Sequence, residues 1–191
     1  MPHAAIANGI LARMAVPPEI SSLLRAGVAA RRGGQLGQAE EYLNQAVAMC
    51  GPDRDFERAL VIRELGELAR HHRDLNAAQA HYEEAVALLR TSPDRLKCAH
   101  TIRHLGDVHA ERHHWPAAER CFVEALTIYR SHPSPGALDL ANAIRAYAVL
   151  KTTAGQREEA RALWVEAGEL YDSTGIAAGV EECRRQAARL A

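Results

Sequence analysis

Four stretches of the chain place small and bulky apolar residues at one fixed spacing. A small residue is followed after twelve residues by an alanine, after sixteen by a bulky residue and after nineteen by a second alanine. Alanines seven residues apart share one face of a helix, and the bulky residue between them fills the space beside it. The pattern predicts that all these residues belong to the core. The sets are Gly27, Ala39, Leu43 and Ala46; Gly66, Ala78, Tyr82 and Ala85; Gly106, Ala118, Phe122 and Ala125; and Ala148, Ala160, Trp164 and Ala167.

A fixed period of this kind predicts a solenoid, in which each unit buries its apolar face against its neighbours. The Leu-Gly steps at 65–66 and 105–106, each followed by the alanine, aromatic and alanine positions, resemble the tetratricopeptide repeat, a helix-turn-helix unit. The resemblance covers residues 20–173. It implies an all-α fold, an alpha-alpha superhelix of four repeats, and a role in binding proteins.

The steps between small residues are longer than the ~34 residues of the common repeat. They are 39 residues from Gly27 to Gly66, 40 from Gly66 to Gly106 and 42 from Gly106 to Ala148. Because the spacing inside each unit is constant, the extra length must lie between units. We therefore expect longer helices there, similar to those of kinesin light chain repeats.

Glycine, proline and aspartate clusters separate the apolar segments and predict the helix boundaries. We expect an N-terminal segment at 1–17 that forms a short helix, and four repeats within 18–175. Residues 176–191 should then form an amphipathic capping helix with Ile176, Val180, Cys183, Ala187 and Leu190 on one stripe. The four repeats should span 18–52, 53–92, 93–134 and 135–175, with helices at 18–32, 36–50, 54–72, 75–91, 94–113, 116–131, 137–154 and 157–173.

Composition narrows the classes of partner. The formal charge of −1 and the 5 per cent of aromatic residues argue against nucleic-acid binding, which needs a clustered basic excess. The basic pairs 31–32 and 184–185 are interpreted as solvated surface charges. No apolar run reaches the ~18 residues of a membrane span, and the first residues lack the pattern of a signal peptide. The four cysteines have no CxxC spacing. We therefore predict a cytoplasmic protein without a disulfide framework.

Three arginines occupy one register of the first helices. Arg63, Arg103 and Arg145, which we call the arginine ladder, each lie three residues before the small residue of their repeat. The family resemblance places first helices on the concave side, where ligands bind. The ladder, with Asn142 nearby, loosely resembles the carboxylate clamp of chaperone-binding members, because the guanidinium group suits carboxylates.

An alternative is that the ladder arginines form ion pairs on the helix surface. Glu67 and Asp107 each follow a ladder arginine by four residues, so they can pair with Arg63 and Arg103. Arg145 is followed at that spacing by Val149 and has no such partner. Arg145 is therefore the strongest single candidate for contact with a ligand.

Histidines 100 and 104 lie four residues apart on the predicted concave face. Such a pair can ligate zinc or nickel, but no HExxH motif or second histidine-rich helix completes the coordination. We therefore predict no metal and no other cofactor. Since histidine titrates near neutral pH, the pair predicts a pH-sensitive groove instead.

The sequence has no phosphate-binding loop, GxSxG motif or dinucleotide fingerprint, so we predict that the protein is not an enzyme. The leading hypothesis is an interaction module that binds an acidic or C-terminal protein segment. The peptide-binding candidates are Arg63, Arg103, Arg145, His100, His104 and Asn142. The alternative is an assembly element that self-associates, for example as a homodimer, through its ends or its N-terminal helix.

Overall fold

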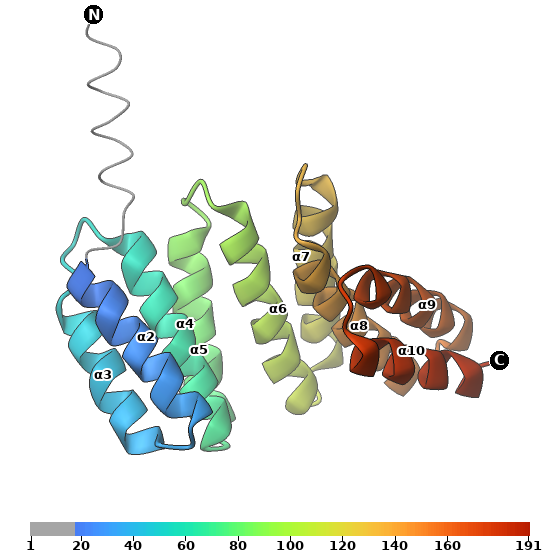
Figure 1. Ribbon diagram of the computed structural model, residues 1–191, viewed down its shortest axis with the longest axis horizontal. Helices are drawn as coiled ribbons and strands as arrows, with labels where there is room; N and C mark the ends of the chain where they lie inside the picture. Colours follow the sequence, from blue (N-terminus) through green and yellow to red (C-terminus); the bar gives the residue numbers. More distant parts are fainter. Residues whose placement is uncertain (1–17) are drawn as a thin grey trace, which may run out of the picture.

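A computed structural model of the protein describes residues 18–191, which form nine α-helices and no strand (Figure 1). The predicted helix at 1–17 lies outside the described residues. The all-α fold is confirmed, with each helix boundary within about three residues of the sequence prediction. The helices are α2 (Pro18–Arg32), α3 (Leu36–Ala48), α4 (Asp55–His71), α5 (Leu75–Leu89), α6 (Arg95–Glu111), α7 (Trp115–Ser131), α8 (Ala137–Thr153), α9 (Arg157–Ser173) and α10 (Ala177–Arg189).

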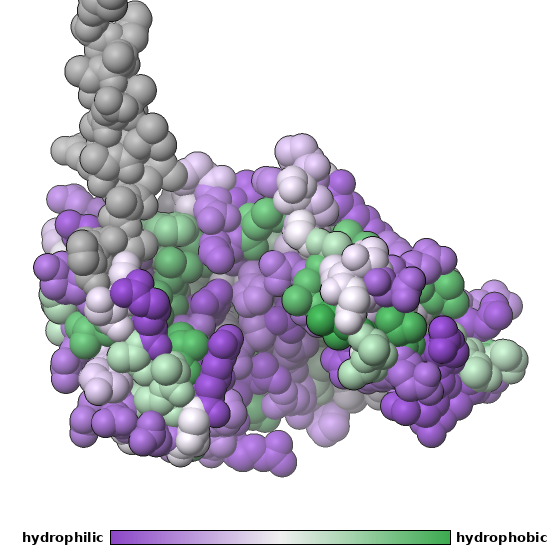
Figure 2. All heavy atoms as spheres, in the orientation of Figure 1, coloured by the Kyte–Doolittle hydropathy of each residue, from purple (hydrophilic) through white to green (hydrophobic). Residues whose placement is uncertain are grey.

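Helices pack as consecutive pairs, α2 with α3, α4 with α5, α6 with α7 and α8 with α9. Each pair follows the last along a curved row from the blue end to the red end of Figure 1. The first helix of a pair also contacts the first helix of the next pair: α2 contacts α4, and α6 contacts α8. We call the surface formed by α2, α4, α6, α8 and α10 the inner face. Figure 2 shows a hollow with hydrophilic residues in the middle of the molecule, between α2 on one side and α10 on the other.

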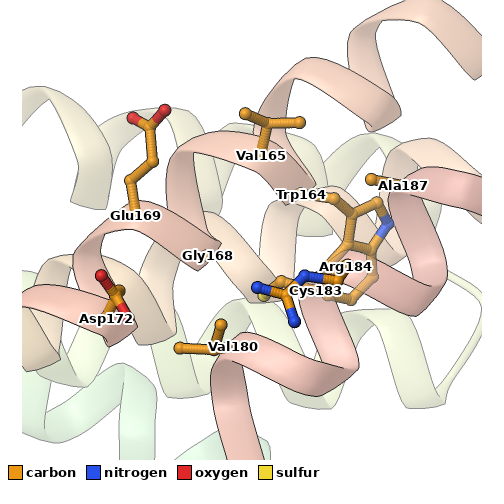
Figure 3. A pocket seen from close by; sticks show the side chains of 9 residues that line it. All are labelled: Trp164, Val165, Gly168, Glu169, Asp172, Val180, Cys183, Arg184 and Ala187. Atoms are coloured by element: carbon orange, nitrogen blue, oxygen red, sulfur yellow. The ribbon is translucent and has the colours of Figure 1, made fainter. Parts of the chain in front are cut away.

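The last helix, α10, packs against α9. Cys183 and Ala187 are its buried residues, and Val180 and Leu190 are partly buried. Ile176 departs from the predicted stripe: it precedes the first turn and is exposed. A hollow of about 340 Å³ lies along α9 and α10, with Trp164, Cys183 and Arg184 among the residues around it (Figure 3).

The repeated small and bulky residues make the contact within each pair. A Cβ atom added at Gly66 would lie 2.9 Å from Cε1 of Tyr82, and one at Gly106 would lie 2.7 Å from Cε1 of Phe122. These distances are shorter than van der Waals contact, so the first helix needs a glycine there for the second to approach. The eight alanines of the pattern are all fully buried (0 % exposed), as the sequence predicted: Ala39, Ala46, Ala78, Ala85, Ala118, Ala125, Ala160 and Ala167.

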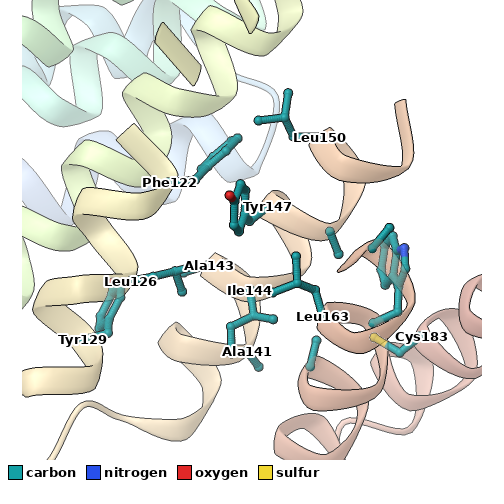
Figure 4. Packing of buried hydrophobic residues seen from close by; sticks show 14 of the residues in the cluster. Phe122, Leu126, Tyr129, Ala141, Ala143, Ile144, Tyr147, Leu150, Leu163 and Cys183 are labelled. Carbon is teal, nitrogen blue, oxygen red and sulfur yellow. The ribbon is translucent and has the colours of Figure 1, made fainter. Parts of the chain in front are cut away.

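The aromatic residues of the pattern are also core residues. Tyr82, Phe122 and Trp164 are each at most 2 % exposed. Trp164 donates a hydrogen bond from Nε1 to Thr152 Oγ1 on α8 (3.0 Å), which satisfies its one polar atom. Figure 4 shows Phe122 and Tyr147 turned toward each other where α7 meets α8, in a cluster that extends to Cys183 on α10.

Each pair turns through a residue in the left-handed backbone region seven positions after its small residue. The turns use Gly34 (φ 77°) and Gly155 (φ 74°) in the first and fourth pairs, but Arg73 (φ 63°) and His113 (φ 61°) in the second and third. The same turn geometry therefore recurs with and without the glycine that favours it.

Candidate binding face

Candidate residues border two hollows on the inner face of residues 18–191. The larger, of about 350 Å³, lies between α6 and α8, and we call it the α6–α8 hollow. The smaller, of about 300 Å³, lies between the starts of α6 and α8 and is bordered by Arg63 of α4. The α6–α8 hollow is lined by Arg70, Arg103, Asp107, Ala110, Glu111, Trp115, Phe122, Asn142, Arg145, Ala146, Val149, Leu150 and Thr153.

Five of the six candidate residues line one of these hollows. Arg103, Asn142 and Arg145 come together around the α6–α8 hollow, whereas Arg63 and His100 border the smaller one. The sixth candidate, His104, lines neither hollow, because its side chain is buried between α4 and α6. Asn142 is already engaged, since its Oδ1 accepts a 2.7 Å hydrogen bond from the Tyr171 hydroxyl.

The first two ladder arginines pair with carboxylates on their own helices. Arg103 Nη1 donates to Asp107 Oδ2 at 2.9 Å, the pair that the sequence spacing suggested. Arg63 instead pairs with Glu64 at 2.5 Å, and Glu67, the partner expected from spacing, turns toward α6. The expected pair of Arg63 with Glu67 is therefore wrong, because a buried histidine on the neighbouring helix binds that carboxylate.

Arg145 has a partner that local spacing could not reveal. Its Nε donates to Glu182 Oε2 at 2.8 Å, and its Nη2 donates to Glu182 Oε1 at 2.9 Å. Glu182 lies on α10, 37 residues further along the chain. The prediction that Arg145 has no partner is therefore correct for its own helix, α8, but not for the neighbouring helix α10. Its side chain nevertheless remains 40 % exposed, the most of the three ladder arginines.

Glu67 is the centre of a buried network between α4 and α6. It accepts hydrogen bonds from the Tyr82 hydroxyl (2.7 Å) and from Nδ1 of His104 (2.7 Å). Arg103 Nη2 lies 2.5 Å from Nε2 of the same histidine, so the ring donates through one nitrogen and accepts through the other. Both ring nitrogens and the carboxylate are thereby satisfied without solvent.

Burial sets the charge states in this network. It lowers the pKa of His104 to about 3, despite the hydrogen bond to Glu67, so the imidazole is neutral at physiological pH. Burial alone would raise the pKa of Glu67, but the hydrogen bonds from His104 and Tyr82 outweigh it and hold that pKa well below its usual range. His104 therefore does not titrate near neutral pH, and the expectation based on ordinary histidine values is wrong for this residue.

Asp107 is the acidic group whose pKa moves toward neutrality. Burial raises the pKa of Asp107 to about 6, against the opposing effect of Arg103 and Arg70. Arg70 lies 3.9 Å from this carboxylate and also contacts Glu67 and Glu111. The pH sensitivity expected of the groove therefore rests on a carboxylate rather than on His104.

Sequence analysis missed Arg70 and Trp115 of the α6–α8 hollow, whereas Glu111 continues the predicted stripe of His100, His104 and Asp107 on the concave face. Trp115 is 39 % exposed and also borders a further hollow of about 380 Å³ near Lys151. The sequence interpretation treated it only as part of a helix break, since Pro116 follows it. Arg70 shares its register with Arg31 of the first repeat, but the third and fourth repeats have Ala110 and Thr152 there, so this position forms no ladder through all the repeats.

Among residues 18–191, no group of three or more histidine, cysteine or acidic side chains is arranged to hold a metal ion. The four cysteines are free thiols. Burial raises the pKa of Cys121 to about 11, which disfavours the reactive thiolate. No helix in the described part of the chain has the length and apolar character required to cross a membrane.

Comparison with known proteins supports the repeat interpretation. Residues 55–131 match the model of the tetratricopeptide repeat family. No curated protein matches the chain.

Solved structures share the fold at low sequence identity. BtubC (BKLC) from P. vanneervenii has a TM-score of 0.63 and 16 % identity, over 90 % of this chain and 89 % of its own. A kinesin light chain-like repeat protein from Podosopora anserina has a TM-score of 0.54 and 18 % identity, over 93 % and 97 %. A chain of the APC/C hetero-tetramer Cut9-Hcn1 has a TM-score of 0.67 and 20 % identity over 86 % of this chain, which spans only 29 % of the solved chain. Residues 55–131 therefore match the tetratricopeptide repeat family, and the helix pairs on either side continue the same fold.

Proposed function

We propose that the protein is a non-catalytic interaction module that binds an extended segment of a partner protein along its inner face. Proteins of this repeat family mediate interactions, and Cut9 forms a hetero-tetramer with Hcn1. The observation that best supports this role here is the α6–α8 hollow, where Arg103, Asn142 and Arg145 meet beside the half-exposed ring of Trp115.

The charge of this hollow favours an acidic segment or a C-terminal carboxylate. The hollow is lined by three arginines, Arg70, Arg103 and Arg145, and by the carboxylates of Asp107 and Glu111, while Glu182 of α10 pairs with Arg145. A ligand carboxylate there would gain charge-assisted hydrogen bonds of about 1.5–3 kcal/mol each where they are shielded from water. Its affinity should fall with added salt, because partly exposed charges are screened.

The test compares two triple variants with the same change in charge. One replaces Arg63, Arg103 and Arg145 by alanine. The control replaces Arg58, Arg90 and Arg130, which each pair with a glutamate but line neither hollow of the inner face.

Partners are captured from native lysate with the wild-type protein, identified by mass spectrometry, purified and titrated calorimetrically against both variants. The ladder variant should weaken binding about tenfold or more, the equivalent of one charge-assisted hydrogen bond, and the control should change it little. Equal affinities for the two variants would refute inner-face binding.

A second candidate is self-association through the C-terminal end. The hollow between α9 and α10 exposes Val165 at 46 % of its surface beside the apolar residues Trp164 and Val180. A second copy covering this hollow would bury that surface. Sedimentation over a range of concentrations should then show a dimer that Val165→Lys dissociates, and a wild-type monomer throughout would exclude this candidate.

A further inference from the structure

The last helix repeats the register of the first helices of the four pairs. From Ala148 to Ala188 the chain advances 40 residues, within the range of the earlier steps. Arg185 lies three residues before Ala188, as Arg145 lies three before Ala148. Helix α10 is therefore equivalent to the first helix of a fifth unit, and Arg185 continues the arginine ladder.

The position of Glu182 within the repeat also explains why its side chain lies on the inner face. It lies three residues before Arg185, just as His100 and Asn142 lie three residues before Arg103 and Arg145. From this position its carboxylate receives two hydrogen bonds from Arg145, at 2.8 and 2.9 Å.

The two arginines around Glu182 differ in what they already bind. Arg145 gives two of its donors to Glu182. Arg185 is exposed, and no carboxylate of residues 18–191 forms an ion pair with it, although its positive charge acts on Glu182. Arg63 and Arg103, in contrast, pair with carboxylates of their own helices. A carboxylate from another helix is thus held between two ladder positions.

We propose that the end of the inner face between Arg145 and Arg185 is a carboxylate-binding site, and that Glu182 occupies it as an internal competitor that a ligand carboxylate displaces. The proposal rests on the proposed function and names the part of the inner face that receives the ligand's charged end. The carboxylate of Glu182 itself indicates the chemical class that this site accepts. Displacement requires only a change of the Glu182 side chain, since that side chain is 28 % exposed.

The test uses matched pairs of neighbouring residues. Glu182→Gln removes the competing charge and keeps the shape of the side chain. Its control is Glu181→Gln, since Glu181 is 65 % exposed and pairs only with Arg184. Arg185→Ala removes the free ladder arginine, and its control is Arg184→Ala, on the side of α10 that borders the hollow with α9.

The probe is a fluorescein-labelled peptide with two C-terminal aspartates and a free carboxylate, compared by fluorescence anisotropy with a C-terminal amide in which both aspartates are replaced by asparagine. Glu182→Gln should strengthen binding of the free acid about two- to fivefold, the range of a partly exposed ion pair, and Arg185→Ala should weaken it by a similar factor. Both controls should match wild type. Circular dichroism and hydrogen exchange of α10 confirm that each variant keeps the helix folded.

The outcomes separate this inference from the proposed function. Binding that depends on Arg63 and Arg103, but is unchanged in Glu182→Gln, would overturn the internal competitor and leave inner-face binding intact. Binding unaffected by any ladder residue would overturn both. No preference for the free acid over the amide in wild type and in Glu182→Gln would also overturn the carboxylate site.

Discussion

Polar side chains connect neighbouring first helices both in the middle of the molecule and at its C-terminal end, but the two sets of contacts differ in their exposure to solvent. Between α4 and α6, Glu67, Tyr82 and His104 form a network shielded from solvent, with direct hydrogen bonds. Between α8 and α10, one ion pair, Arg145 with Glu182, lies about one helical turn earlier in the register and remains partly exposed. The polar residues of the middle hold two helix pairs in place, whereas those of the C-terminal end are accessible to a ligand.

This difference shows that a charged residue in a repeated register does not have one fixed role. Arg103 contributes to the buried network through His104 and Asp107, so replacing it affects the packing as well as any ligand. Arg145 contacts a single, partly exposed carboxylate, that of Glu182 on α10. Loss of stability and loss of binding should therefore separate along the ladder.

The strongest test of this difference removes the central acid of each region. Glu67→Ala leaves the Tyr82 hydroxyl and Nδ1 of His104 without their partner inside the protein, a loss that typically costs about 3 kcal/mol for a buried charged network. Glu182→Ala breaks a partly exposed pair and should cost less than about 1 kcal/mol. Urea unfolding of the two variants measures both values. Similar midpoints would show that the α4–α6 network is not a structural element.

A second test concerns the apolar contact within the middle pairs. Ala118 is fully buried in the contact between α6 and α7, so Ala118→Leu should destabilise the protein by about 1–3 kcal/mol through overpacking. His113→Ala changes a turn residue of the same pair and should cost much less. Chemical denaturation distinguishes them, and equal destabilisation would contradict the assignment of the repeat positions.

The sequence predicted the packing of the repeats well because packing follows local spacing. In each repeat an alanine, a bulky residue and a second alanine follow the small residue after twelve, sixteen and nineteen residues, and all of these side chains are buried in the structure. The fold class and the helices of 18–191 follow from this pattern.

The chemistry of the inner face was harder to predict, because it depends on neighbours from other repeats. Glu182 reaches Arg145 from 37 residues away, and His104 reaches Glu67 from the adjacent first helix. The neutral state of His104 depends on its burial, which spacing on one helix does not reveal. Extending the repeat count by one unit would have identified Arg185 and the inner position of Glu182.

The third prediction concerns the pH dependence of stability and Asp107, the partly buried acid of the middle region. The pKa of Asp107 is raised from about 3.9 in the unfolded chain to about 6 in the folded protein, so folding favours its protonated form. Its contribution to stability is present below pH ~4 and is lost as the pH rises through 6.

Asp107→Asn should remove this contribution from the pH profile. Between pH 4 and pH 6 the wild type should lose stability relative to the variant, on the order of 1 kcal/mol. Thermal unfolding at several pH values measures the difference, in which the other titrating groups cancel. A difference independent of pH would mean that Arg70 and Arg103 keep Asp107 ionised throughout.

The smallest expected effect concerns the turns, where the middle pairs again differ from the C-terminal one. Arg73 adopts the left-handed backbone conformation that Gly155 adopts in the α8–α9 turn. A side chain in that conformation costs about 1–2 kcal/mol, and glycine would remove the cost but lose roughly 0.5–1 kcal/mol through the greater freedom of the unfolded chain. Arg73→Gly should therefore stabilise the protein by about 0.5 kcal/mol, and Gly155→Ala should destabilise it by about the same or more.

Thermal unfolding of both variants measures these opposite shifts. Destabilisation by Arg73→Gly would mean that the arginine side chain makes a stabilising contact that exceeds its backbone strain.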